Sequence, residues 1–122
     1  MPKRSLSSSV LKWPDRKKVV EGLATWAARE APRHRGLVRL GYFGSYARGD
    51  WGVGSDLDLV AVVEESEQPF EQRAIQWDLR GLPVPTEILV YTAREWSALL
   101  ASGSRFARTM QTECIWLPAV TT

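Results

Sequence analysis

Two aspartates, Asp56 and Asp58, flank a single leucine at the start of a run of apolar residues. If this run is a strand, side chains two positions apart point to the same face, with Cα atoms roughly 6.5–7 Å apart. Two carboxylates there repel each other unless a proton or a cation lies between them. Oxygen ligands at this spacing suit Mg²⁺, so the pair predicts a metal site. By itself, an Asp-x-Asp is more often two exposed acids at a strand end.

A second polar feature, Gly44-Ser45, directly follows another short apolar segment. A strand followed by Gly-Ser and a helical turn presents backbone N–H groups and a hydroxyl, an arrangement that binds phosphate. Arg48, about one turn later, is placed to contact the phosphates or to hold the loop. Alone, Gly-Ser is typical of ordinary turns. Joined to the aspartate pair by a glycine-rich loop, it indicates phosphoryl or nucleotidyl transfer.

These residues need a sheet to position them, and the apolar pattern predicts one. Apolar residues at helical spacing predict a first helix that begins at Pro14-Asp15, with Asp15 as its cap, and ends before Pro32 and Gly36. Thr92 to Glu95 has the pattern of a capping box. We predict strands over 37–43, 57–63, 84–91 and 115–117, and helical segments over 45–48, 70–80, 92–100 and 104–111. Within 70–80 we expect Phe70, Ala74, Trp77 and Ile75 to face the core. The alternation favours a small α/β or α+β domain around a mixed sheet of three to four strands.

The length and composition of the chain fit one globular domain. The chain has 122 residues, of which 44% are hydrophobic and 25% charged. We expect a flexible basic, Ser-rich segment over 1–13 and a single domain over 14–122. The net charge of +2 does not by itself indicate nucleic-acid binding. The basic first segment fits a solvated tail or a contact with RNA or an acidic partner. A single cysteine and the absence of a secretion signal or a bilayer-long apolar run suggest the cytoplasm.

The segment from Gly44 to Leu59 resembles the signature of the DNA polymerase beta-like nucleotidyltransferase superfamily: Gly-Ser, a short spacer, then Asp-x-Asp. The A-R-G after Gly-Ser and the S-D-L-D-L ending resemble its small prokaryotic members, the minimal nucleotidyltransferases of the MntA antitoxin type. The resemblance implies a nucleotidyltransferase fold. It also implies that Gly44, Ser45, Arg48 and Ser55 bind the nucleotide, and that Asp56 and Asp58 hold one or two Mg²⁺ ions.

The family uses a third carboxylate on a neighbouring strand, and the resemblance implies Glu87 for this role. Glu87 interrupts an apolar strand, which is unusual without a partner, although an edge-strand charge facing solvent is the alternative. The family more often has aspartate here, and glutamate is one methylene longer. Glu87 would complete the metal site and help to deprotonate an acceptor hydroxyl. That hydroxyl would attack the α-phosphorus of ATP, and pyrophosphate would leave.

The small size of the chain implies that the acceptor is bound by this domain, by a second copy or by a partner. The resemblance implies an antitoxin that transfers AMP to a tyrosine of a HEPN-domain protein. Two alternatives stay open, a non-catalytic module that neutralises a partner by contact and a transferase acting on a small molecule such as an antibiotic. Of the six tryptophans, Trp51 lies in the glycine loop, where it either stacks on a ligand or folds back onto the domain. The other five are expected at core or helix-face positions, and His34 at the surface.

Overall fold

A computed structural model describes residues 13–118 of the chain. The first helix in this range is α2 (Arg16–Glu30). Most of the predicted basic segment therefore lies outside the described residues. Asp15 caps the helix as predicted, because its carboxylate accepts a hydrogen bond from the backbone N–H of Lys18 at 2.9 Å. A 3₁₀ turn, η1 (Ala31–Arg33), and Gly36 with φ of 82° end it, so the predicted boundary is confirmed.

The centre of the molecule is a sheet of four strands in the order β3-β2-β1-β4. Its strands are β1 (Leu37–Phe43), β2 (Leu57–Val63), β3 (Thr86–Thr92) and β4 (Ile115–Trp116). Strand β1 pairs antiparallel with both β2 and β4, whereas β2 and β3 are parallel. The predicted mixed sheet is thus confirmed. The C-terminal end of β1 and the N-terminal ends of β2 and β3 lie side by side at the same end of the sheet.

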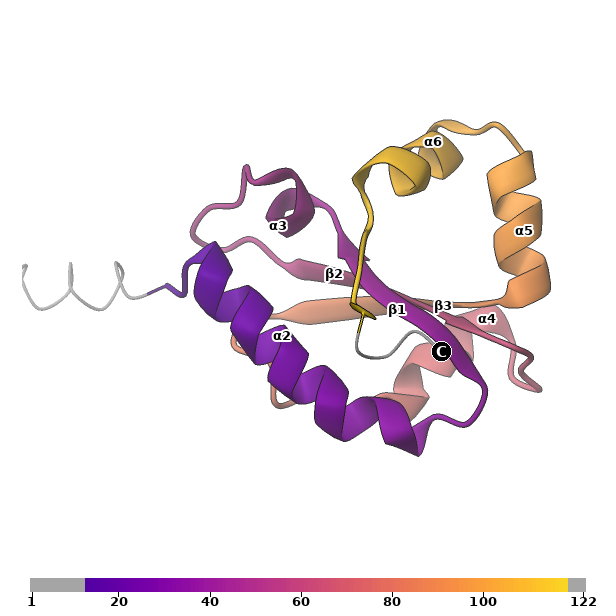
Figure 1. The fold of residues 1–122 in the computed structure, drawn as a ribbon, viewed down its shortest axis with the longest axis horizontal. Coiled ribbons are helices and arrows are strands. Elements are labelled where there is room, and N and C mark those ends of the chain that lie inside the picture. The colour runs from indigo at the N-terminus through magenta and orange to yellow at the C-terminus, as the bar shows by residue number, and fades with distance from the viewer. Residues whose placement is uncertain (1–12, 119–122) are drawn as a thin grey trace, which may run out of the picture.

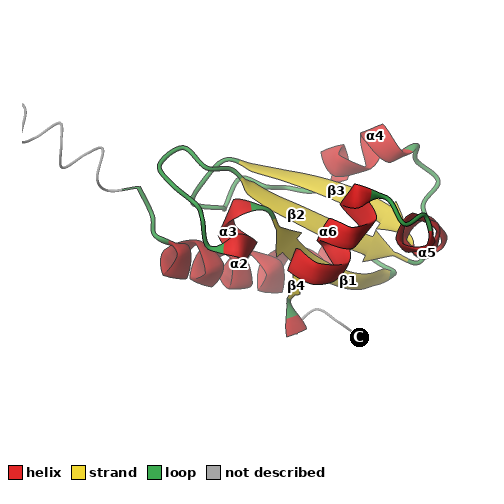
Figure 2. Cartoon of the chain, turned by 90° about the horizontal axis from the view of Figure 1, so that it is seen from above, coloured by secondary structure: helices red, strands yellow, loops and turns green. Residues whose placement is uncertain are grey.

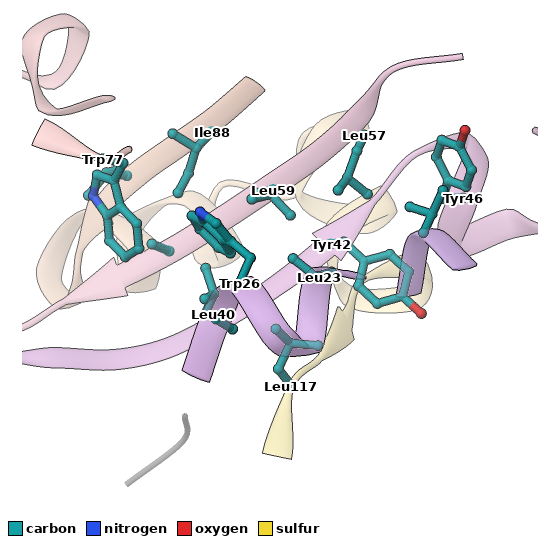
Figure 3. Packing of buried hydrophobic residues seen from close by; sticks show 14 of the residues in the cluster. Leu23, Trp26, Leu40, Tyr42, Tyr46, Leu57, Leu59, Trp77, Ile88 and Leu117 are labelled. Carbon is teal, nitrogen blue, oxygen red and sulfur yellow. The ribbon is translucent and has the colours of Figure 1, made fainter. Parts of the chain in front are cut away.

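Each face of the sheet is covered by its own helices, as Figure 1 shows with α2 below the strands and α5 and α6 above them. Strand β2 reads as a continuous apolar run because both of its faces are buried. Leu57 and Leu59 pack with Leu23 and Trp26 of α2 on one face (Figure 3). Val60 and Val62 pack with Trp96 and Met110 on the other face.

Two helices connect β3 to β4 and cover the second face of the sheet, where they are seen in front of the strands in Figure 2. Helix α5 (Ala93–Ala101) begins with the predicted capping box, in which Thr92 and Glu95 bond reciprocally to each other's backbone N–H groups. Helix α6 (Arg105–Glu113) is capped by Ser104 and leads directly into β4. The short α3 (Ser45–Arg48) follows β1, as predicted.

The predicted helix over 70–80 is wrong in its second half. Helix α4 (Phe70–Arg73) passes into a 3₁₀ turn, η2 (Ala74–Gln76), and Trp77 is already extended. Leaving the helix lets Trp77 enter the core beside Trp26, with ring centroids 6.0 Å apart. Ile75, predicted to face the core, is 81% exposed instead. A core site for one large ring therefore outweighs the local helical pattern.

The prediction that His34 is a surface residue is also wrong. The imidazole of His34 stacks on Trp77 with 3.6 Å between ring centroids, and its Nε2 lies 2.8 Å from Glu30 Oε2. The buried Glu30 carboxylate also accepts the backbone N–H of Asp78 at 3.1 Å. His34 therefore helps to hold the irregular segment after η2 against the end of α2.

No helix among residues 13–118 is long and apolar enough to cross a bilayer.

Candidate active site

The predicted site residues gather at the edge of the sheet where β1 ends and β2 and β3 begin. Asp58 is the second residue of β2, and Asp56 lies just before the strand. Asp58 pairs in register with Phe43 of β1 on one side and with Glu87 of β3 on the other. Because register neighbours share a face, the three side chains point toward the side covered by α6.

The Gly44-Ser45 turn lies directly against the carboxylate of Asp58. Gly44 has φ of 81° and ψ of −154°, a conformation that is essentially restricted to glycine. A side chain at Gly44 would collide with Oδ2 of Asp58, so the absence of a Cβ is what lets the turn approach the acid. The turn that was predicted to bind phosphate and the aspartate pair are therefore adjacent in space.

A cavity of about 420 Å³ opens between this turn and α6. Its walls combine acidic groups, the Gly-Ser turn and two aromatic rings. Phe43 and Phe106 meet edge to face in its apolar part, with centroids 6.0 Å apart. The residues that line it are Phe43, Gly44, Ser45, Arg48, Asp56, Asp58, Phe106, Thr109 and Glu113.

Glu87 lies beside the cavity and does not line it. Its register with Asp58 brings the two backbones to neighbouring positions on parallel strands, but its side chain is exposed. The charge of Glu87 still raises the pKa of Asp58. The predicted role of Glu87 as a third ligand or base requires its side chain to turn toward Asp58, and it stays a prediction.

Arg48 and Ser55, two of the residues predicted to bind the nucleotide, hold the glycine loop in this structure. Arg48 donates from Nε to Asp50 at 3.0 Å, and its NH1 lies 3.4 Å from Glu113. Ser55 closes the loop through two bonds with Gly52: its hydroxyl accepts the N–H of Gly52 at 2.8 Å, and its own N–H donates to Gly52 O at 2.9 Å. Nucleotide binding by Arg48 and Ser55 stays a prediction.

Trp51 folds back onto the domain, which confirms one of the two readings of its position in the loop. Its ring stacks on Tyr46 with 5.9 Å between centroids and an interplanar angle of 8°. Tyr46 is fully buried, and its hydroxyl accepts a hydrogen bond from Nε1 of Trp13 at 3.1 Å. Trp26, Trp77 and Trp96 are buried, and Trp13 and Trp116 are half-buried, as predicted.

Glu113, at the end of α6, is a site residue that the sequence did not reveal. Its Oε2 accepts the backbone N–H of Gly44 at 3.0 Å, and its side chain is 15% exposed. In the sequence it is one more charge at the end of a polar helix. Only the pairing of β4 with β1 brings it to the turn. Gly41 pairs with Trp116 and Tyr42 with Ile115, so continuing this register sets Glu113 opposite Gly44.

Negative charge accumulates around Asp58. Partial burial raises the pKa of Asp58, and the carboxylates of Glu87 and Asp56 raise it further. Glu113 acts in the same direction, and only Arg48 opposes them. The metal-free site therefore makes the ionised form of Asp58 less favourable than it is in water, and a divalent cation would relieve this repulsion.

The chemistry of these oxygen donors fits a hard divalent cation such as Mg²⁺. Asp56 and Asp58 both line the cavity and face the Gly44-Ser45 turn. Within residues 13–118, no group of three or more His, Cys, Asp or Glu side chains is arranged to hold a metal ion as it stands. Mg²⁺ is usually bound by one or two carboxylates together with substrate phosphates and water. The pair is thus suited to a cation that arrives with the nucleotide.

Comparison with known proteins agrees with this geometry. The profile of the nucleotidyltransferase domain family matches residues 26–108. Among solved structures, a candidate nucleotidyltransferase from Sulfolobus solfataricus is similar in fold, with a TM-score of 0.60 at 19% sequence identity. The similarity covers 83% of this chain and 80% of that protein. A search of curated proteins found no match. The matched region contains the Gly44-Ser45 turn, both aspartates and Glu87.

Proposed function

Because the chain belongs to the nucleotidyltransferase domain family, we propose that it transfers AMP from ATP to a hydroxyl acceptor in a Mg²⁺-dependent reaction. One observation carries the proposal above all. The turn suited to phosphate and the carboxylate pair suited to a cation meet so closely that a Cβ on Gly44 would collide with Asp58. Nucleotidyl transfer needs these two groups side by side, since one binds the phosphates and the other the cation that accompanies them.

Each residue of the site has a separate task in the proposed reaction. The Gly44 N–H and the Ser45 hydroxyl donate to oxygens of the triphosphate. Asp56 and Asp58 hold Mg²⁺, with Glu87 as the third carboxylate. When bound, the cation neutralises phosphate charge and stabilises the leaving pyrophosphate. The acceptor oxygen forms a bond to the α-phosphorus while the bond to pyrophosphate breaks, and Glu87 accepts the proton of the acceptor hydroxyl.

The acceptor that we propose is a tyrosine of a HEPN-type toxin, which AMP addition would silence. The support is the resemblance of the Gly44 to Leu59 signature to minimal nucleotidyltransferase antitoxins. An open cavity of about 420 Å³, lined by both acidic and aromatic side chains, is compatible with an acceptor presented by a partner protein.

The test uses purified protein with Mg²⁺ and ATP labelled on either the α- or the γ-phosphate. A transferase should place only the α-label on the protein encoded by the neighbouring gene, and the modified tyrosine should be found by mass spectrometry. Label from the γ-position on the partner would indicate a kinase instead. The absence of both labels with any acceptor would contradict the proposal.

A contact-only neutraliser is the second candidate, and the exposed side chain of Glu87 outside the cavity favours it. Asp56→Asn separates the two functions, because it removes one cation ligand from an exposed position without disturbing the core. An enzyme should lose AMP transfer and neutralisation together. A contact-only module should still neutralise its partner.

A further inference from the structure

The carboxylate of Glu113 accepts a hydrogen bond from the Gly44 N–H, the same group that donates to phosphate in the proposed reaction. Its Oε2 accepts the Gly44 N–H at 3.0 Å, and its carboxylate lies 3.4 Å from NH1 of Arg48. A phosphate oxygen would be expected to take both of these donors. A carboxylate therefore stands where the anionic part of a nucleotide would bind.

The backbone around Glu113 holds it at this position. Glu113 is the last residue of α6, and β4 begins two residues later. Strand β4 lies close on β1 at Gly41, where a Cβ would come within 2.6 Å of Ile115 O and 2.8 Å of the Trp116 ring. The absence of a side chain at Gly41 thus allows β4 to lie this close to β1, in the register that sets Glu113 opposite the turn.

The charges around the turn indicate that the contact with Glu113 weakens the binding of anions. Asp56, Asp58, Glu87 and Glu113 all lie around the turn, and Arg48 is the cation nearest to them. A fixed negative charge on the donors lowers the affinity of the turn for another anion. Charge-assisted hydrogen bonds are also stronger than neutral ones, so replacing this carboxylate has a cost that a free turn would not impose.

We propose that Glu113 is a positioning residue that sets nucleotide affinity: it keeps the Gly44 N–H and Arg48 engaged until the phosphates displace it. Binding then requires the Glu113 side chain to turn away from Gly44, and Arg48 passes from Glu113 to the phosphates. This inference rests on the proposed function of the turn as a phosphate site.

The test measures binding of inorganic pyrophosphate alone, and of ATP with Mg²⁺, by titration calorimetry. Glu113→Gln keeps an oxygen that can accept the Gly44 N–H but removes the charge. It should tighten the binding of both probes by about tenfold, the value of one charge-assisted hydrogen bond at the low end of its range. The pyrophosphate arm excludes any change in cation affinity. Glu21→Gln on the exposed face of α2 removes the same charge far from the site and should change neither Kd.

The amide resonance of Gly44 gives a readout that does not depend on activity or on fold stability. In ¹⁵N-labelled wild-type protein it should lie downfield because of the carboxylate, and it should move upfield in Glu113→Gln. Glu113→Asp keeps the charge but shortens the side chain, so its pyrophosphate affinity should lie between the other two. If the glutamine variant unfolds, the aspartate variant still tests the order of affinities.

Unchanged or weaker pyrophosphate binding in Glu113→Gln would overturn the inference, since Glu113 would then hold the turn in its binding shape. This result is distinguishable from failure of the proposed function. AMP transfer with an unchanged Kd would refute only the role of Glu113. Tighter binding without any AMP transfer would refute the transferase and leave the role of Glu113 standing.

Discussion

At the scale of single residues, the site depends on one glycine and one partly buried acid in contact. Gly44 has a backbone conformation that other residues rarely adopt, and its missing side chain makes room for Asp58. Asp58 is in turn surrounded by carboxylates. The like charges around Asp58 oppose stability, and the conformation of Gly44 excludes almost every other residue. Their presence at the same point indicates that binding, and not folding, is served here.

Gly44→Ala is expected to destabilise the protein by about 1–3 kcal/mol and to abolish nucleotide binding. The new methyl group meets both an unfavourable φ and the Asp58 carboxylate. Urea unfolding and calorimetric titration with ATP would measure the two effects. Gly49→Ala is the control for a positive φ without a collision. Its φ of 91° and ψ of 7° lie in the left-handed helical region, which other residues tolerate better, and nothing lies within 4 Å of its Cβ position. Normal nucleotide binding by Gly44→Ala would contradict the close approach.

Asp58→Asn is expected to remove activity while stabilising the metal-free protein at neutral pH. Burial and the neighbouring acids raise the pKa of Asp58 in the folded state. The folded chain thus binds this proton more tightly than the unfolded chain. Stability falls as pH rises from the ordinary carboxyl pKa through the raised one. Thermal unfolding between pH 3 and pH 8 should show that the stability of the variant relative to the wild type increases as the pH rises across this window.

Glu67→Gln, at an exposed loop position, is the charge-matched control for this experiment. Because the Glu67 side chain is exposed, this substitution should change the free energy of unfolding little in the same scan. If the stability of Asp58→Asn relative to the wild type did not change with pH, the surroundings of Asp58 would not raise its pKa in the folded state.

At the scale of elements, a buried guanidinium joins three segments near the end of β3 that leads into α5, away from the site at the beginning of this strand. Arg73 of α4 is 6% exposed and donates to Gln68 O at 2.8 Å and to Val90 O of β3 at 3.0 Å. It also forms two bonds to Glu95 in the first turn of α5, at 2.6 and 3.1 Å. Because Glu95 also closes the capping box at Thr92, this pair fixes the exit of β3 into α5.

Arg73→Met should destabilise the protein by about 2–4 kcal/mol, because two carbonyls and Glu95 lose their donor. Urea unfolding would measure it. The loss should also depend on pH. Arg73 holds the pKa of Glu95 down to about 2, so the pair stabilises the fold above the ordinary carboxyl pKa and less as pH falls toward 2. In the variant this acid-dependent loss should shrink. Arg94→Met is the control, since Arg94 is an exposed arginine of the same helix as Glu95 and is next to it in the sequence.

At the scale of the whole molecule, one sheet carries both cores and the site. The larger core lies between α2 and the sheet, and the smaller lies under α5 and α6. The site takes residues from β1, β2, the glycine loop and α6, so it exists only when both faces are assembled. Ligand binding is therefore expected to stabilise the entire fold and not one segment.

Mg²⁺ and ATP at about 100 times their Kd should raise the free energy of unfolding by about 2.7 kcal/mol. Calorimetry should record this as an upward shift of a single transition, because no part of the fold can unfold and keep the site. Asp58→Asn should show no shift with the same ligands. Two transitions, of which only one moved with ligand, would contradict the cooperative unit.

Much of the fold could be read from local patterns. Apolar runs predicted β1, β2 and β3, and a capping signal predicted the start of α5, because these features depend on neighbours in the sequence. The Gly44-Ser45 turn and the Asp56-Asp58 pair were found in the same way, because each motif is local. The sequence by itself thus determined the elements, the family and half of the site.

The tertiary structure alone decided which distant residues meet. Glu113 bonds to Gly44 across 69 positions of the chain, and His34, which the sequence placed at the surface, stacks on the buried Trp77. The order of the strands also set Glu87 beside Asp58 while leaving its side chain exposed. Strand order and close packing arise from the fit of whole faces, and no local period in the chain encodes them. The physical reason is that hydrophobic burial is non-directional, so which surfaces pair is settled only when all of them compete.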